Sequence, residues 1–271
     1  MLTTNSMGGN IVSAIVIFTL IFYTRFQLLD NQYKYSFEPD SEACVSVTKS
    51  FYNFFKNPCK ETIPNTLSSY PPYQDGDFIF GAITANCIRI LVNIGCLETN
   101  VGDGDNSIII CAMRWNGVFF QCLAGVLVFM IVLILTDCTL ASALITVIYF
   151  ILSPQLLDID LIRIDYFYFF SAVVLFYASL RLVVQPNKGI NYTLAGISTA
   201  LVVSTKMNFP FYLLPVIASF IYLFIHKKVS TKYVFVFFYL VRYFVHFFIS
   251  KMVILPRRDT PYRFRNFDYW R

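Results

Sequence analysis

The sequence predicts an all-α membrane protein, a polytopic bundle of about seven transmembrane helices with a long extracytoplasmic first loop that carries interfacial helices. Of its 271 residues, 57% are hydrophobic and 14% are charged, whereas soluble domains average about 25% charged residues. The mean hydropathy is +0.61, and apolar runs recur almost to the C-terminus. A soluble domain with one membrane anchor would not show this recurrence.

The apolar runs indicate seven helices, separated by polar or proline-containing breaks. No small-residue cleavage site follows the first run, so we expect a retained helix and not a signal peptide. Residues 1–255 are expected to form one membrane domain, followed by a basic, aromatic tail at 256–271. The seven expected helices are 11–29, 115–136, 139–153, 166–184, 191–205, 211–225 and 233–255.

A long and mostly polar region, 30–113, separates the first two expected spans. Its segment 78–97 is apolar but contains Arg89, and an arginine at the bilayer centre costs about 2.5 kcal/mol or more. We therefore expect helices that lie at the interface or re-enter the membrane there. If 78–97 crosses the membrane instead, everything before it changes side.

The positive-inside rule orients the predicted bundle. The loop 226–232 is the most basic short loop, so it is expected in the cytoplasm, together with the turns at Asp137 and 185–190. Alternation then places 30–113 and 155–165 outside. The net charge of +5 is expected for a membrane protein and requires no nucleic-acid partner.

Three carboxylates lie close together after the first expected span, in the stretch Phe37-Glu38-Pro39-Asp40-Ser41-Glu42. An amphipathic helix follows, because Val47, Phe51, Phe54 and Phe55 recur at helical spacing. Asp40 has two interpretations. It is either the N-cap of that helix, where aspartate is favoured, or a catalytic carboxylate held at the membrane surface.

In this topology charged residues from separate segments converge on the outer face. Carboxylates suit a general base or a metal ion, and Arg and Lys suit phosphate. Together they suit transfer from a lipid-phosphate donor, in which a base deprotonates an acceptor hydroxyl and cations stabilise the leaving phosphate. The converging residues are Asp40, Glu42, Arg89, Arg114, Arg163, Asp165 and Lys206.

These residues also have purely structural interpretations. Arg163 and Asp165 are two residues apart, so on a helix they do not face each other and simply lie at the headgroup level. Lys206 snorkels from a helix end, and Arg89 attaches an interfacial helix to lipid phosphate. The seven cysteines form no C-x-x-C pair, which argues against a metal cluster. Five of them lie in the outer region, where disulfides are an option: Cys44, Cys59, Cys87, Cys96 and Cys111.

Taken in order along the chain, several motifs resemble those of the polytopic GT-C glycosyltransferases, in particular the dolichyl-phosphate-mannose protein mannosyltransferase and aminoarabinose transferase-like group. Pro39-Asp40-Ser41-Glu42 follows the first span, where that family has an acidic motif. Tyr70-Pro71-Pro72-Tyr73 is similar to its Tyr-Pro-Pro-Leu segment before interfacial helices. Arg114 opens the second expected span, as an arginine often does there.

Two further motifs complete the resemblance. Arg163-Ile164-Asp165-Tyr166 is similar to the charged stretch after the third helix of the family. Ala195-Gly196-Ile197, followed by Ser204-Thr205-Lys206, is similar to its Gly-Leu-Ala and Thr-Lys pattern. The match covers residues 10–225, and the order of the motifs carries it, because no single motif is specific.

The resemblance implies a membrane glycosyltransferase of the cell envelope. It would transfer a hexose or pentose from a polyprenyl-phosphate donor to a hydroxyl of a glycan, lipid or protein acceptor on the extracytoplasmic face. It implies Asp40 as the catalytic base, with Glu42 assisting it or helping to bind a divalent cation, Mg or Mn. The residues expected near the donor phosphate are Arg163, Lys206 and Arg89, and the further site candidates are Asp165, Arg114 and Tyr70.

Two features depart from the family pattern. Ser41 splits the acidic pair, and the chain is short, which predicts a truncated or minimal form. The alternatives are a non-catalytic accessory or degenerate protein of the same fold, and a transporter or flippase. A transporter is expected to have helices broken at corresponding places in two halves, and the sequence shows no internal repeat. The expected location is a bacterial inner membrane, with the endoplasmic reticulum membrane as the alternative.

Overall fold

The computed structural model describes residues 4–31, 39–56, 75–97, 107–152, 165–205, 209–229 and 231–253. Every regular element within these residues is an α-helix, which confirms the all-α prediction. The helices are α1 (Thr4–Asn31), α2 (Pro39–Lys56), α3 (Asp75–Asn93), α4 (Ser107–Thr136), α5 (Thr139–Leu152), α6 (Asp165–Val184), α7 (Gly189–Thr205), α8 (Phe209–Tyr212), α9 (Leu214–Ile225) and α10 (Thr231–Val253).

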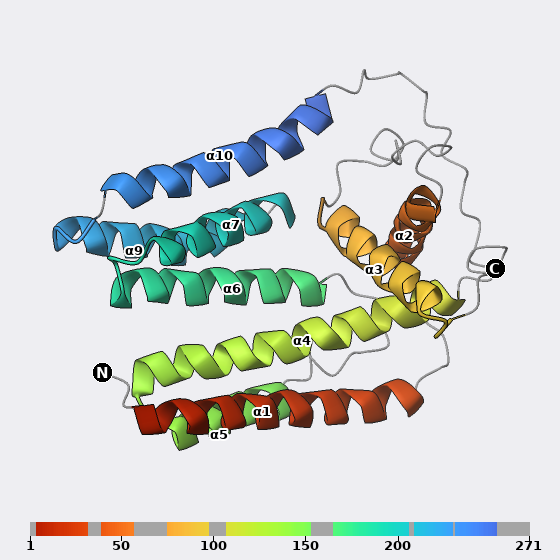
Figure 1. Cartoon of the computed structure of the whole chain (residues 1–271), viewed down its shortest axis with the longest axis horizontal. Helices are drawn as coiled ribbons and strands as arrows, with labels where there is room; N and C mark the ends of the chain where they lie inside the picture. The colour runs from red at the N-terminus through yellow and green to blue at the C-terminus, as the bar shows by residue number, and fades with distance from the viewer. Residues whose placement is uncertain are drawn as a thin grey trace, which may run out of the picture.

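The helices form a bundle with two distinct ends (Figure 1). Helices α1, α4 and α5 pack together, α6 packs on α4, and α7, α9 and α10 continue the bundle beyond α6. Helices α2 and α3 pack on each other beside the start of α4, and we call this the α2–α3 end. The opposite end, called the turn end, carries the turns at 137–138, 185–188 and 226–229.

Buried hydrophobic side chains form three clusters along the bundle. The first joins α2 and α3 to α4 and α6, the second joins α1, α4 and α5, and the third joins α6, α7, α9 and α10. Glycines permit the closest helix contacts in the second and third clusters. Ile21 of α1 lies where a side chain on Gly125 of α4 would begin, and Leu240 of α10 lies against Gly196 of α7.

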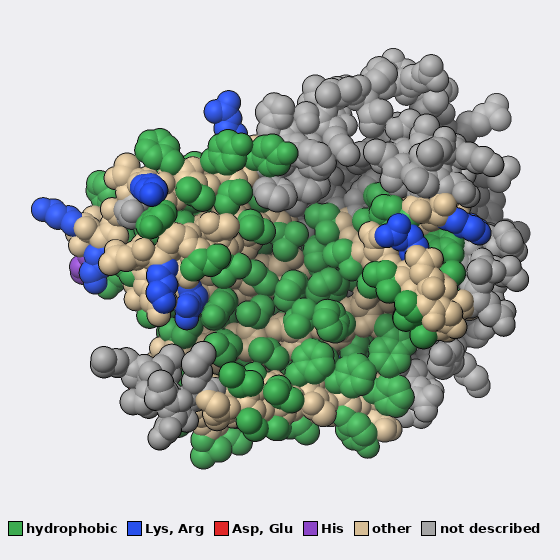
Figure 2. Space-filling view, in the orientation of Figure 1, with side chains coloured by type: hydrophobic (Ala, Val, Ile, Leu, Met, Phe, Trp, Pro, Cys, Tyr) green, Lys and Arg blue, Asp and Glu red, His purple; other side chains and the backbone are tan. Residues whose placement is uncertain are grey.

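Three of the helices are long and apolar enough to cross a membrane: Gly8–Gln27, Ser107–Thr136 and Tyr166–Val184. Large hydrophobic side chains cover much of the surface, as Figure 2 shows. Exposing so much apolar surface to water is unfavourable, whereas contact of that surface with lipid acyl chains is favourable. The chain therefore has the features of a membrane protein with three candidate spans.

The other four expected spans are not confirmed in the described residues, and three of them, α5, α7 and α9, are short. The apolar parts of α5, α7 and α9 are Thr139–Phe150, Gly189–Val203 and Leu214–Ile225. At 1.5 Å per residue even α7, with 17 residues, is about 26 Å long, less than the ~30 Å of a hydrocarbon core. The expected helix 211–225 is divided at Leu213, and Pro215, which lacks a backbone N–H, stands in the first turn of α9.

Some of the other helix and turn positions agree with the sequence prediction, and others differ from it. The turn at Asp137 is confirmed, and Asp137 has the left-handed φ of 51°. The second expected span begins at Ser107 and not at 115, so Arg114 lies two turns inside α4 instead of opening it. The segment 78–97 is one helix, α3, followed by a turn at Gly95. Among the described cysteines of the outer region, Cys87, Cys96 and Cys111 are free thiols and Cys44 is buried, and Cys59 lies outside the described residues.

Candidate functional site at the α2–α3 end

Helix α2 is amphipathic, as its hydrophobic spacing predicts. Val47 and Tyr52 are buried, and Phe51 and Phe55 pack against the first cluster. Burial raises the pKa of the Tyr52 phenol, because the phenolate would lose its hydration there. The side chain of Phe54 lies outside the described residues. The apolar face of α2 therefore attaches the helix to the bundle.

Helices α2 and α3 run side by side in the same direction. A Cβ on Gly81 of α3 would lie 3.0 Å from Val47 Cγ1 of α2. Eight residues further along both helices, the Arg89 guanidinium lies 5.6 Å from the centre of the Phe55 ring. If this register is continued back toward the helix starts, Asp75, the first residue of α3, is level with Ser41 of α2.

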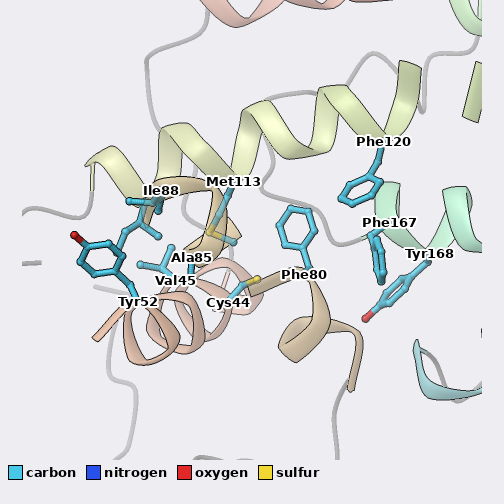
Figure 3. Close-up of a cluster of buried hydrophobic side chains, with 11 residues drawn as sticks. Cys44, Val45, Tyr52, Phe80, Ala85, Ile88, Met113, Phe120, Phe167 and Tyr168 are labelled. Atoms are coloured by element: carbon cyan, nitrogen blue, oxygen red, sulfur yellow. The ribbon is translucent and has the colours of Figure 1, made fainter. Parts of the chain in front are cut away.

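The first cluster connects this helix pair to two candidate spans. In Figure 3, Phe80 of α3, Phe120 of α4 and Phe167 of α6 point toward one another. Their ring centres lie 5.0 to 6.3 Å apart, a separation at which aromatic pairs attract. Cys44 of α2 and Leu201 of α7 also contribute to the cluster. The start of α6 and the last turns of α7 are therefore near the α2–α3 pair.

The residue at which α2 begins disagrees with one of the two interpretations of Asp40. The helix begins at Pro39, and proline favours the first helical position because its φ is already helical and its missing N–H is not needed there. Asp40 therefore lies inside α2, one turn before Cys44, and the N-cap interpretation is wrong. A carboxylate in the first turn is stabilised by the helix dipole. The side chains of Asp40 and Glu42 lie outside the described residues.

Asp40 and Glu42 are a poor pair for a shared metal ion. Positions two apart on a helix point roughly 200° apart, so they do not face each other. The register described above brings Asp75 and Asp77 of α3 level with this part of α2, and sequence reasoning gave those two residues no role. Among the described side chains, no group of three His, Cys, Asp or Glu could hold a metal ion.

The packing of α3 on α2 does not place Arg89 near Asp40. It is exposed and lies over the Phe55 ring, which is a cation–π contact. Phe55 is 15 residues along α2 from Asp40, or about 22 Å at the helical rise. One donor phosphate does not suit both residues at this separation. The geometry favours a structural role, in which Arg89 holds α3 against Phe55 of α2.

The remaining predicted site residues belong to α4, to α6 or to segments outside the described residues. Arg114 is partly buried in α4, one residue after Met113 of the first cluster. Asp165 is the first residue of α6, two before Phe167, and its side chain is outside the described residues. Lys206 follows Thr205, the last residue of α7, directly in the sequence. The predicted residues outside the described part of the chain are Arg163, Lys206 and Tyr70.

Sequence reasoning missed one buried cation, Arg25. Its side chain is 1% exposed, and Nη2 donates a hydrogen bond of 2.7 Å to the carbonyl oxygen of Phe150. Phe150 lies in the last turn of α5, where the helix dipole is negative and carbonyls lack helical partners. Nε and Nη1 have no hydrogen-bond partner among the described residues.

Arg25 is the only charged residue in Gly8–Gln27, the span candidate of α1. An ionisable residue inside a membrane helix is a functional candidate by default, and this signal was available in the sequence. Gln121 of α4 is also fully buried. Neither of its amide atoms has a hydrogen-bond partner among the described residues.

Comparison of the chain with known protein families, with curated proteins and with solved structures finds no match. The protein is therefore described by its own fold. Its described residues form an all-helical protein with three helices able to cross a membrane and a pair of helices, α2 and α3, packed at one end.

Proposed function

We propose that this protein is a multi-pass membrane glycosyltransferase that uses a polyprenyl-phosphate sugar at the α2–α3 end. One observation carries the proposal. The acidic motif Pro39-Asp40-Ser41-Glu42 opens α2, and α2 is packed through the first cluster on the candidate spans α4 and α6. A carboxylate is thereby attached to rigid elements at the level where a membrane-bound donor would present its phosphate.

The chemistry requires a base and a cationic phosphate site. Asp40 would take the proton of the acceptor hydroxyl, which then attacks the anomeric carbon of the donor sugar. The bond from that carbon to the phosphate oxygen breaks, and the polyprenyl phosphate leaves. Arg163 and Lys206, which lie next to α6 and α7 in the sequence, would stabilise the charge on the leaving phosphate.

The distribution of charge supports an extracytoplasmic site. The turn end carries Lys188, Lys227, Lys228 and Lys232, and basic short loops face the cytoplasm. The α2–α3 end then faces outward, where lipid-linked sugars are used as donors. A bacterial inner membrane suits this arrangement, with the endoplasmic reticulum membrane as the alternative.

A divalent cation is no part of the proposed steps. If one binds, one carboxylate from the start of α3 is a better companion for Asp40 than Glu42, because α3 is a neighbouring helix. Asp75 and Asp77 are two residues apart, so they would not both face α2. Such an ion would supply positive charge for a phosphate oxygen.

The test is sugar transfer by Asp40→Asn. Membranes that contain the unaltered chain are expected to transfer labelled sugar from one of a panel of polyprenyl-phosphate donors. Asp40→Asn, which keeps the size of the side chain but cannot act as a base, is expected to reduce transfer by about 100-fold or more.

Asp137→Asn is the matched control. Asp137 is an exposed aspartate at the opposite end, and asparagine tolerates its left-handed φ. This variant is expected to transfer sugar as the unaltered chain does. Full activity of a folded Asp40→Asn variant would exclude Asp40 as the base and favour an accessory role for the protein.

A further inference from the structure

The turn end gathers basic side chains from two adjacent turns. Lys188 lies between α6 and α7, Lys227 and Lys228 lie between α9 and α10, and all three are exposed. The two turns meet, because a Cβ on Gly189 would lie 2.8 Å from Cε1 of Tyr233 in the first turn of α10. Lys and Arg side chains are visible on this side of the molecule at the left of Figure 2.

These cations lie where the candidate spans end. The span of α4 ends at Thr136, the span of α6 ends at Val184, and the span of α1 begins at Gly8. The first residue of α5, Thr139, donates a 2.9 Å hydrogen bond to Asn10 of α1, which joins these helix ends. The level of the lysines is therefore the level at which hydrocarbon gives way to lipid headgroups.

Large apolar side chains near the lysines in the sequence are also exposed. Phe224 and Ile225 at the end of α9 are 78% and 68% exposed, and Ile190 at the start of α7 is 66% exposed. Lysine directs its ammonium group toward water or phosphate while apolar neighbours meet acyl chains. Apolar and basic groups together therefore match a lipid headgroup with its chains and not a soluble anion.

Lys227 occupies a position that normally favours glycine. The N–H of Lys227 donates to Phe224 O and the N–H of Lys228 donates to Leu223 O, at 3.1 and 2.9 Å, which is a Schellman motif with Lys227 at the left-handed residue. Its φ is 52°. A side chain is strained there, so lysine is less stable than glycine at this position.

The end of α3 shows the same motif without the strain. The N–H groups of Gly95 and Cys96 donate to Val92 O and Leu91 O, at 3.0 and 2.9 Å. The left-handed residue is Gly95, with a φ of 78°. Helices α3 and α9 thus end in the same motif. The left-handed residue is glycine after α3 and lysine after α9, at the turn end.

We propose that the turn end is a binding surface for the phosphate of anionic lipid headgroups, with Lys227 as its central cation. The phosphate lies among Lys227, Lys228 and Lys188, and the acyl chains lie along Phe224 and Ile225. Of the carboxylates described in the structure, Asp137 is the one at this end, so the surface keeps a positive field. This surface requires that the chain lies in a membrane, and it does not depend on glycosyl transfer.

The test measures lipid affinity of the purified full chain in neutral detergent, from the rise in thermal unfolding temperature as lipid is added. Phosphatidylglycerol is expected to stabilise the protein at lower concentration than phosphatidylcholine. Lys227→Gly is expected to bind phosphatidylglycerol about fivefold more weakly, the ratio that corresponds to one lysine at an anionic surface. Without lipid, Lys227→Gly is expected to unfold at the same or a higher temperature, because glycine relieves the strained φ.

The matched control is Lys56→Gln, which removes an exposed lysine from the end of α2 and is expected to leave phosphatidylglycerol affinity unchanged. Inorganic phosphate is expected to give no stabilisation, because it has no acyl chain. Equal affinity of Lys227→Gly and the unaltered chain for phosphatidylglycerol would overturn the proposal. So would an equal loss in Lys56→Gln, or stabilisation by inorganic phosphate alone.

Discussion

At the residue scale, the least expected feature is Arg25, a cation buried between helices. One nitrogen binds the Phe150 carbonyl oxygen at the end of α5, a hydrogen bond of about 1.5–3 kcal/mol for a charged donor. Against this stands the cost of an arginine in a membrane helix, which is about 2.5–3.5 kcal/mol at the helix centre on insertion scales and is smaller near the end of the span, where Arg25 lies. The two effects nearly cancel, so Arg25 is not expected to be a main source of stability.

Arg25→Met tests this balance, because methionine fills a similar part of the volume without the charge. The free energy of unfolding is expected to change by no more than about 1 kcal/mol, since the lost hydrogen bond and the removed charge offset each other. Thermal unfolding in detergent measures this as a shift of a few degrees. A destabilisation of 3 kcal/mol or more would mean that Arg25 has a strong anionic partner.

The start of α2 shows what local sequence can and cannot predict at this scale. The spacing of Val47, Phe51 and Phe55 predicts an amphipathic helix, and the structure confirms it. The proline before Asp40 also indicates a helix start, and it argues against the N-cap, one of the two interpretations of Asp40. The relation between Asp40 and Asp75 depends on the packing of α2 against α3, which no local pattern contains.

At the element scale, close helix contacts depend on glycine. A Cβ on Gly196 of α7 would lie 3.2 Å from Leu240 Cβ and 3.3 Å from the Phe237 carbonyl oxygen of α10. A backbone oxygen cannot rotate away as a side-chain end can. A larger side chain at this position would therefore press directly on the backbone of α10.

Gly196→Leu is accordingly expected to destabilise the protein by about 1–3 kcal/mol through overpacking, measured by thermal unfolding in detergent. Gly8→Leu is the matched control, because nothing lies within 4 Å of a Cβ there. The control is expected to be neutral or slightly stabilising, since leucine favours helix more than glycine does. Equal unfolding temperatures for the two variants would contradict the close contact of α7 with α10.

The sequence predicts helix boundaries best where polar or proline-containing segments flank the helix. The expected helices at 139–153 and 166–184 agree to within one residue with α5 and α6, because polar or proline-containing segments flank them. The start of α4 was placed too late, because Arg114 was taken as a boundary although Ile108 to Met113 continue the helix. The division at Leu213 was also missed, since the apolar run continues through it.

At the scale of the whole molecule, the two ends differ in chemistry. The turn end carries exposed lysines and the ends of three candidate spans. The α2–α3 end carries the amphipathic helix α2, the helix α3 packed on it, and the acidic starts of both helices. The composition predicts a membrane protein, and the three candidate spans agree with it. Seven crossings are not confirmed by the described helices, in part because α5, α7 and α9 are apolar but short.

The central claim is that the acidic start of α2 lies on the outer side of the membrane and the basic turns lie on the inner side. Single cysteines introduced as Ser41→Cys and Lys188→Cys, each in a chain whose seven native cysteines are replaced, test it in intact cells. A membrane-impermeant maleimide is expected to label the Ser41→Cys variant at once and the Lys188→Cys variant only after lysis. Labelling of the Lys188→Cys variant in intact cells, with protection of the Ser41→Cys variant, would contradict the account.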